Sequence, residues 1–431
     1  MRTLKKYPFS LTDDAKKRLL LWAQQFDEAI WLDSNNYPQK HGIYKAILAV
    51  DAFTALKTDA HNAFDKLKEY QTTTADWLFG YLSYELKNDV EKLQSHNFDG
   101  LEFPDLYFFQ PKKLFLFTES TVEIQYLNLA ADEMEEDWKS ISEIVYQPTE
   151  NEAFKALKTS IRTSKESYIQ KVNEVLAHIQ RGDIYEANLC QEFYSETSQI
   201  NPLESFFHLN EISRAPFSAF LKLDNLFALS ASPERYIQRI GDTVISQPIK
   251  GTAKRLKNKA DDIKIAQQLA QDPKERSENI MITDLVRNDL SRIAKKGSVA
   301  VEELCAIYTF EQVHQLISTI SCTVPQNTPS VSILRNTFPM GSMTGAPKIS
   351  AMQIIEDMED AKRGVYSGAI GYFSPNGDFD FNVVIRSILY NSHKKYVSFS
   401  VGSAITINSI PEKEYEECLL KAKAMRQVLN S

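Results

Sequence analysis

A glutamate and a lysine lie near each other around a predicted β-hairpin. Residues 232–252 contain two β-prone runs on either side of Gly241-Asp242, a dipeptide that favours a tight turn. Folding the chain about this turn brings Glu234 within about one residue of the position opposite Lys250, where side chains of neighbouring strands approach to about 5 Å. The stretch therefore predicts an acid and an amine at the open end of a hairpin. A weak surface ion pair is the alternative.

Two pairs of glutamates have the spacing of one helix face. Glu275 and Glu278 are three residues apart in a stretch of helical pattern at 264–290, and Glu414 and Glu417 repeat the spacing in a helix predicted after Pro411. Carboxylates in such pairs suit Mg²⁺, which takes one or two of them and keeps several waters. The alternative is that both pairs lie on solvated helix faces.

A glycine-containing turn and a lone arginine are candidates for binding an anion. Residues 338–348 read F-P-M-G-S-M-T-G-A-P-K, which lacks the spacing of a Walker A loop. They predict a turn that leads into a helix starting at Pro347, and helix N-termini bind anions. A structural turn is the alternative. Arg386 falls inside an apolar run at 381–389 that is predicted as a strand, where we expect its guanidinium to pair with a carboxylate.

The elements around these residues predict an α+β protein. Helical patterns occupy 11–26 and the stretch after Thr163, which with Glu166 forms a capping box and ends at Gly182. A second hairpin is expected around Asp224-Asn225, and a strand at 397–407 is interrupted at Gly402. Consecutive antiparallel strands of this kind favour an α+β fold over a parallel, doubly wound one.

Composition limits the classes of function. The net charge of −8 argues against a general nucleic-acid binder and against an anionic membrane surface as partner. Four widely spaced cysteines fit unpaired thiols in a reducing compartment. The first ten residues lack the apolar core of a signal peptide, and no apolar run approaches the roughly 20 residues that span a bilayer. We therefore expect a cytoplasmic protein with no membrane partner.

Taken together, the motifs resemble the chorismate-utilising enzymes. From about Tyr168 to the end, the resemblance rests on S-P-E-R, P-I-K-G-T, D-L-V-R-N-D-L, F-P-M-G-S-M-T-G-A-P-K and P-E-K-E-Y-E-E. G-Y-L-S-Y-E-L and F-P-D-L-Y-F-F-Q-P extend it to the N-terminal part. It implies a two-layer antiparallel β-sandwich with helices packed outside and the two halves of the chain interleaved. Residues 1–145 would form the family's N-terminal region and 150–431 its chorismate-binding catalytic domain, with the acidic run 131–137 and the polar run 147–152 at the boundary.

The resemblance also implies a role for each candidate residue. Glu275, Glu278, Glu414 and Glu417 would form the Mg²⁺ site, with Glu278 and Glu417 as the direct ligands. Lys250 would be a nucleophile and Glu234 a general acid. Tyr366, Arg386 and Lys421 would hold the substrate's carboxylates, and backbone amides around Gly402 could bind a carboxylate as well. By motif position, the same site would also be lined by Thr252, His314 and Ser342. For His314, a core histidine with satisfied hydrogen bonds is the alternative.

The lysine in P-I-K-G-T resembles the branch of the family that aminates chorismate at C4. This resemblance implies chorismate and ammonia as reactants and 4-amino-4-deoxychorismate, a precursor of para-aminobenzoate and folate, as product. Because no glutaminase module is recognisable in the chain, we expect ammonia from a separate glutamine amidotransferase subunit. Within the family the alternative is an anthranilate-forming enzyme, whose members typically have alanine at this position. Outside catalysis, the alternative is a silent relative that only binds.

Several positions depart from the family pattern. Glu186 stands where glutamine is usual and where the isochorismate and salicylate synthases have a water-activating lysine. Ala404 and Asn408 interrupt a usually glycine-rich segment. The implied chemistry needs a neutral amine and a protonated acid, so we expect a depressed pKa for Lys250 and a raised pKa for Glu234.

Overall fold

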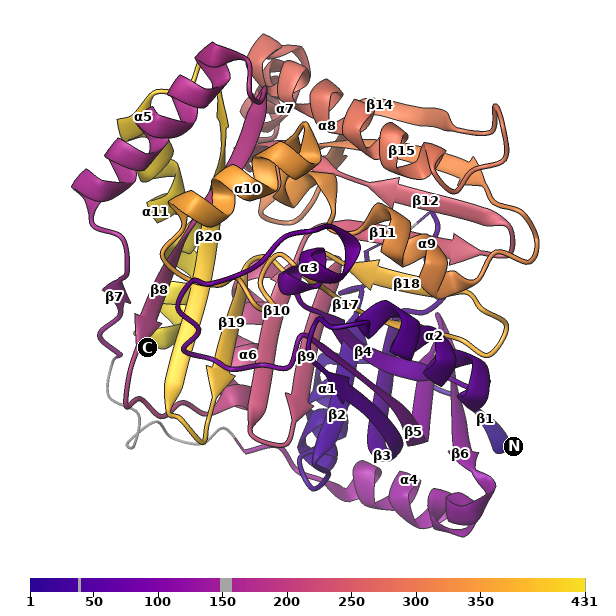
Figure 1. Cartoon of the computed structure of the whole chain (residues 1–431). Helices are drawn as coiled ribbons and strands as arrows, with labels where there is room; N and C mark the ends of the chain where they lie inside the picture. The colour runs from indigo at the N-terminus through magenta and orange to yellow at the C-terminus, as the bar shows by residue number, and fades with distance from the viewer. Residues whose placement is uncertain (38–39, 148–156, 431) are drawn as a thin grey trace.

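The β-strands form an antiparallel framework that runs through one shared strand. The computed structural model describes residues 1–37, 40–147 and 157–430, and every ladder between its named strands is antiparallel. Strand β5 (Leu106–Phe117) pairs along its length with β3 (Ala46–Thr58), and its first residues also pair with β4 (Leu78–Leu82). Two layers therefore meet at β5 and fold over each other (Figure 1).

The first layer joins a block of strands from the N-terminal part of the chain to a block from the C-terminal part at the β2–β9 ladder. From one edge its order is β1 (Arg2–Pro8), β6 (Thr121–Leu127), β5, β3, β2 (Glu28–Asp33), β9 (Phe217–Leu223), β10 (Leu226–Ser232), β19 (Ser387–Asn391), β20 (Tyr396–Thr406), β8 (Glu186–Ser195) and β7 (Ser160–Ile161). The predicted hairpin around Asp224-Asn225 is confirmed as β9 and β10.

The second layer contains the predicted Gly241-Asp242 hairpin. Its order is β4, β17 (Ala369–Phe373), β18 (Phe379–Asn382), β11 (Arg235–Ile240), β12 (Thr243–Gln247) and β15 (Val313–Thr323). β13 (Ile249–Lys254) continues along the same edge of β15 as β12, and β14 (Ala300–Thr309) takes the other edge. The β2–β9 and β4–β17 ladders join the N-terminal and C-terminal parts of the chain, one in each layer.

Apolar side chains on the two faces of the first layer contribute to two different hydrophobic cores. Ile30 of β2 and Leu221 of β9 face the second layer, where they join Phe381 in one core. Their sequence neighbours Trp31 and Phe220 face the helices in the other. Because side chains alternate between the faces of a strand, one layer can line both cores. The predicted two-layer sandwich with outer helices is confirmed.

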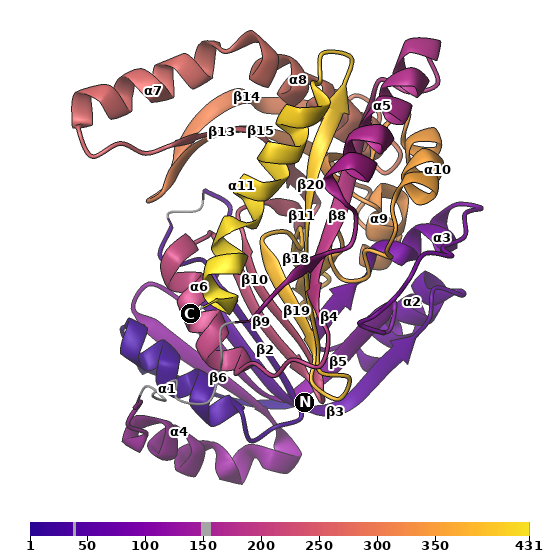
Figure 2. The ribbon, with the colours of Figure 1, turned by 90° about the vertical axis from the view of Figure 1, so that its left-hand side faces the viewer.

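The helices cover both outer sides of the strands. Figure 2 shows α1 (Asp13–Ala23), α4 (Met134–Glu143), α6 (Pro202–Ser213) and α11 (Pro411–Leu429) on one side, and α2 (Ala63–Thr74), α3 (Lys87–Val90), α9 (Ser330–Thr337) and α10 (Lys348–Met358) on the other. α5 (Lys165–Arg181) packs on α11. α7 (Lys259–Gln271) and α8 (Pro273–Ser291) cover one end of the strands. Within the described ranges, no helix has the length and apolar character of a membrane span.

The structure corrects several predicted boundaries. The helical pattern at 264–290 is two helices, because Asp272 caps α8 by accepting hydrogen bonds from the amides of Lys274 and Glu275. α5 is capped by Ser164, and the hydroxyl of Thr163, the predicted cap, donates instead to Asp360. Pro347 caps α10, whose first residue is Lys348. The predicted boundary at 147–152 falls mostly on residues 148–156, outside the described residues.

Candidate active site

Lys250 makes its closest polar contact with Glu186. Its ammonium nitrogen lies 3.1 Å from Glu186 Oε1, and the two side chains are only 14% and 1% exposed. Glu186 begins β8 and is flanked by β20 and by the short strand β16 (Gly345–Ala346), which pairs with it from the glycine turn. Its second oxygen, Oε2, is buried without a hydrogen-bond partner. The nucleophile candidate thus faces a buried carboxylate from a strand 64 residues away in sequence.

The expected cross-strand pair of Glu234 and Lys250 does not form. The β11–β12 hairpin closes its register at Arg235 and Gln247, so Glu234 lies beyond the ladder. Pro248 lacks the N–H that would continue it, and Lys250 belongs to β13, which pairs with β15. Lys250 and Glu234 remain electrostatic neighbours, but the direct partner of the amine is Glu186.

Glu234 has the protonation behaviour that a general acid needs. Burial raises the pKa of its carboxyl to about 7, against smaller lowering effects of the Ser342 hydroxyl, the Lys250 ammonium and the Ile249 amide. A hollow of about 20 Å³ lies beside Glu234 and Ser342. The prediction of a proton retained near neutral pH is confirmed.

The prediction for Lys250 is wrong for this conformation. Burial lowers the pKa of its ammonium, but Glu186, Glu278 and Glu234 together raise it by more, so that it lies above the ordinary lysine value. Desolvation alone would depress the pKa, but the carboxylates that surround the amine reverse its effect. In this conformation Lys250 is an ammonium ion.

Helix α8 presents the first glutamate pair to β13. Asn279 donates hydrogen bonds to the carbonyl oxygens of Lys250 at 3.4 Å and Leu316 at 3.1 Å, which fixes the helix against the strands. At Gly251, where φ is +89°, a Cβ would lie 3.1 Å from Glu275 Oε2, so only glycine allows this approach without strain. Burial raises the pKa of Glu275, and it raises that of Glu278 to about 7.

Helix α11 brings the second glutamate pair to the same place. Its start lies beside α8 at one end of the strands (Figure 2), and the pKa of Lys274 on α8 is raised by the carboxylates of both helices, against a lowering by burial. Glu414 is buried and accepts a hydrogen bond from Ser403 of β20. Glu417 lies 2.6 Å from Lys421, whose attraction outweighs burial and lowers the pKa of Glu417.

These carboxylates fit a Mg²⁺ ion held by few protein ligands. Glu278 Oε1 is buried and accepts no hydrogen bond from the part of the chain that the structure describes, and Lys274 Nζ is 3.8 Å away. An unsatisfied buried carboxylate oxygen is costly unless a cation meets it. Among the described residues, no three acidic, cysteine or histidine side chains are grouped closely enough to enclose a metal by themselves. Mg²⁺ suits such a site because it keeps waters and takes oxygens from the substrate.

Arg386 and Lys421 are both neighbours of Glu417, and Tyr366 is a neighbour of Arg386. Arg386 is not inside a strand as predicted; it precedes β19 with φ of +54°, and Tyr366 and Glu417 are its electrostatic neighbours. Its guanidinium forms no hydrogen bond or ion pair with any residue in the described ranges, so it is available to an anionic ligand. Tyr366 is buried beneath it, with its hydroxyl 3.7 Å from Cys190 Sγ.

Gly402 of β20 lies opposite Cys190 of β8. A Cβ there would come within 2.6 Å of both Asn188 Oδ1 and Cys190 Sγ. Lys421 donates a hydrogen bond to the Gly402 carbonyl oxygen at 2.8 Å. β20 runs through this position without the predicted interruption, because the glycine serves close packing between strands and not a break in the strand.

Of the other predicted site residues, one lies beside Glu234 and two do not point to a role in binding. Ser342 lies beside Glu234 in the short turn Gly341–Met343. Thr252 is exposed and pairs through its backbone with Gln315. His314 has both ring nitrogens engaged, with Asp262 at 3.0 Å and Thr309 at 2.9 Å, which matches its alternative as a core histidine. All four cysteines are buried and unpaired, as predicted.

Two residues with clear roles in the site were not predicted. Asn279 fixes α8 to Lys250, and Lys348 connects the glycine turn to α8 through Asp289 at 2.6 Å and the Pro339 carbonyl oxygen at 2.8 Å. Lys348 is the last residue of the quoted F-P-M-G-S-M-T-G-A-P-K motif, and Asn279 follows Glu278 directly. Their positions inside or directly beside these motifs are the signal in the sequence that could have identified them.

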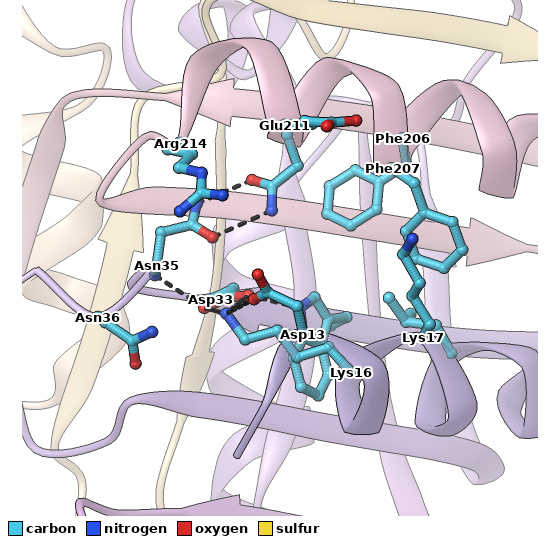
Figure 3. A pocket seen from close by; sticks show the side chains of 13 residues that line it. Asp13, Lys16, Lys17, Asp33, Asn35, Asn36, Phe206, Phe207, Glu211 and Arg214 are labelled. Atoms are coloured by element: carbon cyan, nitrogen blue, oxygen red, sulfur yellow. Dashed lines mark hydrogen bonds and ion pairs between the residues drawn. The ribbon is translucent and has the colours of Figure 1, made fainter. Parts of the chain in front are cut away.

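A separate hollow lies outside this site. It measures about 170 Å³ and lies between α1 and α6, where Figure 3 shows Lys16 and Asp33 facing each other. These two form a buried ion pair at 2.8 Å, and Asn35 donates a hydrogen bond to Asn210 at 2.8 Å. None of the predicted site residues lines it.

The comparisons with known proteins agree on one family. A family model described as chorismate binding enzyme matches residues 8–427. The chain is 40% identical over 268 residues to aminodeoxychorismate synthase component 1 of Klebsiella aerogenes, covering 62% of this chain and 59% of that protein. It is 30% identical over 392 residues to the Bacillus subtilis (strain 168) protein of the same name, covering 88% and 80%. The crystal structure of anthranilate synthase component I from Streptococcus pneumoniae superposes with a TM-score of 0.76 at 25% identity, covering 91% of this chain and 95% of that one.

Proposed function

Because the chain belongs to the family of chorismate-binding enzymes, we propose that it is the chorismate-aminating component of an aminodeoxychorismate synthase. It would convert chorismate and ammonia to 4-amino-4-deoxychorismate. The observation that carries the proposal is Lys250, a buried amine close to Glu234, an acid that keeps its proton near neutral pH. The similarity to two curated aminodeoxychorismate synthase components supports it.

Lys250 and Glu234 divide the chemistry of the first step. Glu234 gives its proton to the departing C4 hydroxyl, which leaves as water. The electron pair of Lys250 Nζ forms a bond to C2 while the two ring double bonds shift and the C4–O bond breaks. Ammonia then adds at C4, the double bonds shift back and the C2–N bond to Lys250 breaks. Covalent attachment replaces one hard substitution by two easier ones.

Mg²⁺ would be held between α8 and α11. Glu278 and Glu417 would be its direct ligands, with Glu275 and Glu414 completing the surrounding carboxylates. The ion would neutralise the ring carboxylate of chorismate. The unsatisfied Oε1 of Glu278 is the observation that supports this placement.

The cations beside Glu417 orient the substrate. The guanidinium of Arg386, which pairs with none of the described residues, is shaped to take a carboxylate through two parallel hydrogen bonds. Tyr366 is its neighbour and Lys421 pairs with Glu417, so a second carboxylate contact can come from either side chain. Two anchored carboxylates fix the ring so that C2 faces the amine and C4 faces the acid.

Ammonia would come from a partner subunit. The curated relatives are named component 1, which implies a second component, and we propose a glutamine amidotransferase in that role, in the same cytoplasmic compartment. Any ammonia that it releases must reach the site between Lys250 and Glu234.

Anthranilate synthesis is the second candidate, favoured by the similarity to the pneumococcal structure. The two reactions give different products from the same reactants. Chromatography and mass analysis of a reaction with chorismate, Mg²⁺ and ammonium should show 4-amino-4-deoxychorismate. Anthranilate as the main product would reject the proposal, and so would unchanged chorismate from a folded protein.

A further inference from the structure

Among the described residues, Glu186 is the carboxylate in direct contact with the amine that the proposed reaction uses. Glu186 Oε1 and Lys250 Nζ are 3.1 Å apart, and both side chains are withdrawn from solvent. The other oxygen of Glu186 has no hydrogen-bond partner within residues 1–37, 40–147 and 157–430. Neither the roles proposed above for Glu234 nor those for the metal-site glutamates explain why a second acid should be buried against the nucleophile.

Building on the proposed function, we infer that Glu186 is a positioning residue that accepts the surplus proton of Lys250 before attack and returns it after release. Transfer from Nζ to Oε1 along the existing hydrogen bond converts an ammonium–carboxylate pair to an amine and a carboxylic acid. Two buried charges disappear together, which offsets the desolvation that the closed site imposes on them. Rotation about the Cε–Nζ bond then turns the lone pair towards C2.

The surroundings of Lys250 explain why a dedicated acceptor is required. Carboxylates face the amine from four elements: Glu186 from β8, Glu234 before β11, Glu275 and Glu278 from α8, and Glu417 from α11. They hold the amine in its charged form, which cannot attack. Glu234 must keep its own proton for the leaving hydroxyl, and the remaining glutamates are assigned to the metal. Glu186 is therefore the acceptor that the arrangement leaves free.

The proton balance closes over the cycle. Lys250 gives one proton to Glu186 and attacks C2 with the freed electron pair, and Glu234 supplies the proton that leaves with the C4 hydroxyl as water. When the C2–N bond breaks, the amine of Lys250 recovers its proton from Glu186. The ammonium group newly formed at C4 gives one proton back to Glu234. The net reaction is chorismate plus ammonia to 4-amino-4-deoxychorismate plus water, with no further reactant.

The pH dependence of kcat separates this internal transfer from loss of the proton to solvent. If the proton moves internally, the starting state keeps its charge. With Glu278 held by saturating Mg²⁺, Glu234 is then the group whose ionisation, at a pKa of about 7, shapes the profile. At constant free ammonia and with saturating chorismate and Mg²⁺, wild-type kcat should be level from about pH 6 to 7 and then fall about tenfold per pH unit. In Glu186→Gln, Lys250 must lose its proton to solvent. Its kcat should rise about tenfold per unit up to about pH 7 and be level above.

Glu186→Asp is the companion variant, because it keeps a carboxylate on a shorter side chain. We expect a lower kcat with the wild-type shape of the profile. A glutamine amide can still accept a hydrogen bond, so a purely structural Glu186 predicts the same shape in all three proteins. That result, or a rising profile in Glu186→Asp, would overturn the inference. Failure of the wild type to aminate chorismate at C4 would instead reject the proposed function itself.

Discussion

At the scale of single residues, the site separates two carboxyl groups by their surroundings. Glu234 is enclosed among apolar and hydroxyl groups, and burial raises its pKa to about 7. Glu186 has the same chemistry but touches an ammonium ion at 3.1 Å. Placing acids of one type in contrasting environments is a general way to assign donor and acceptor roles at one pH. The acid that donates at C4 and the acid that receives from Lys250 can therefore act in one pocket.

Replacement of Glu234 by glutamine tests the donor role. The amide has nearly the same shape but cannot donate a proton to the leaving hydroxyl, so we expect kcat for C4 amination to fall by about 100-fold to 10,000-fold. The residual rate should also no longer fall above about pH 7, because that fall comes from ionisation of Glu234. Steady-state kinetics at constant free ammonia provides both readouts. A variant that keeps more than half of the wild-type kcat would show that the proton comes from elsewhere.

At the scale of elements, α8 and α11 hold carboxylates that cost stability until a cation meets them. Glu278 has its pKa raised by burial from 4.5 to about 7. The unfolded chain ionises at the ordinary value and the folded protein only near 7. The folded state therefore binds the extra proton between these limits, and its stability falls as pH rises through them. Such sites exchange stability for function.

Glu278→Gln should therefore stabilise the metal-free protein at alkaline pH. With EDTA at pH 8, we expect the free energy of unfolding to rise by at most about 3 kcal/mol, with no gain below about pH 4.5. Added Mg²⁺ should stabilise the wild type by mass action and leave the variant unchanged. Urea unfolding at the two pH values measures both effects. Glu416→Gln, an exposed position on α11, is the matched control and should behave as wild type.

If Glu278→Gln destabilises the protein at pH 8, its carboxylate already has a stabilising partner. An equal response of wild type and variant to Mg²⁺ would contradict the placement of the ion on α8. Activity assays complete the test, because turnover should vanish in excess EDTA and return with Mg²⁺.

The sequence predicts contacts between residues that are close along the chain better than contacts between distant ones. The spacing of Glu275 and Glu278, and of Glu414 and Glu417, is enough to place each pair on a helix face, because that contact is local. The turn at Gly241-Asp242 fixes its hairpin for the same reason. The partner of Lys250 was not predictable in this way, since the contact with Glu186 spans 64 residues and depends on how β13 and β8 lie in space.

Errors in the predicted site have the same origin. Pro248 ends the β11–β12 ladder and sends β13 to β15, which removes the expected pairing of Glu234 and Lys250. His314 could be assigned to the ligand site or to the core, and only the position of Asp262 on α7 decides between them. The depressed pKa expected for Lys250 required knowing how many carboxylates surround it.

At the scale of the whole molecule, strands from both parts of the chain pair in each layer, so the site forms only when both parts fold together. β2 and β4 from the N-terminal part complete layers whose other strands support β8, β13 and β20. The core between the layers is continuous across both parts. Stability and activity should therefore respond together to changes in either part.

The proposed partner subunit leads to a prediction about which nitrogen source the chain can use. Incubated with chorismate and Mg²⁺, this chain should not use glutamine, while ammonium chloride at pH 8 should support turnover because more of it is free ammonia. Addition of the proposed glutamine amidotransferase should confer glutamine-dependent product formation. Product chromatography with each nitrogen source checks this. Rapid glutamine-dependent turnover by the purified chain alone would refute the need for a partner.

The central claim, that Lys250 forms the covalent bond to chorismate, is tested most directly by product analysis of Lys250→Ala. With chorismate, Mg²⁺ and ammonium, the variant should lose formation of 4-amino-4-deoxychorismate down to the level without enzyme, although ammonia can still add slowly at C2. Lys250→Arg should be no better, because a guanidinium stays protonated at any working pH. Both should keep a cooperative thermal transition, and intact-protein mass of the wild type should reveal an adduct on Lys250. If Lys250→Ala makes 4-amino-4-deoxychorismate at near the wild-type rate, the covalent mechanism is wrong and Lys250 is only an electrostatic neighbour of Glu234 and Glu186.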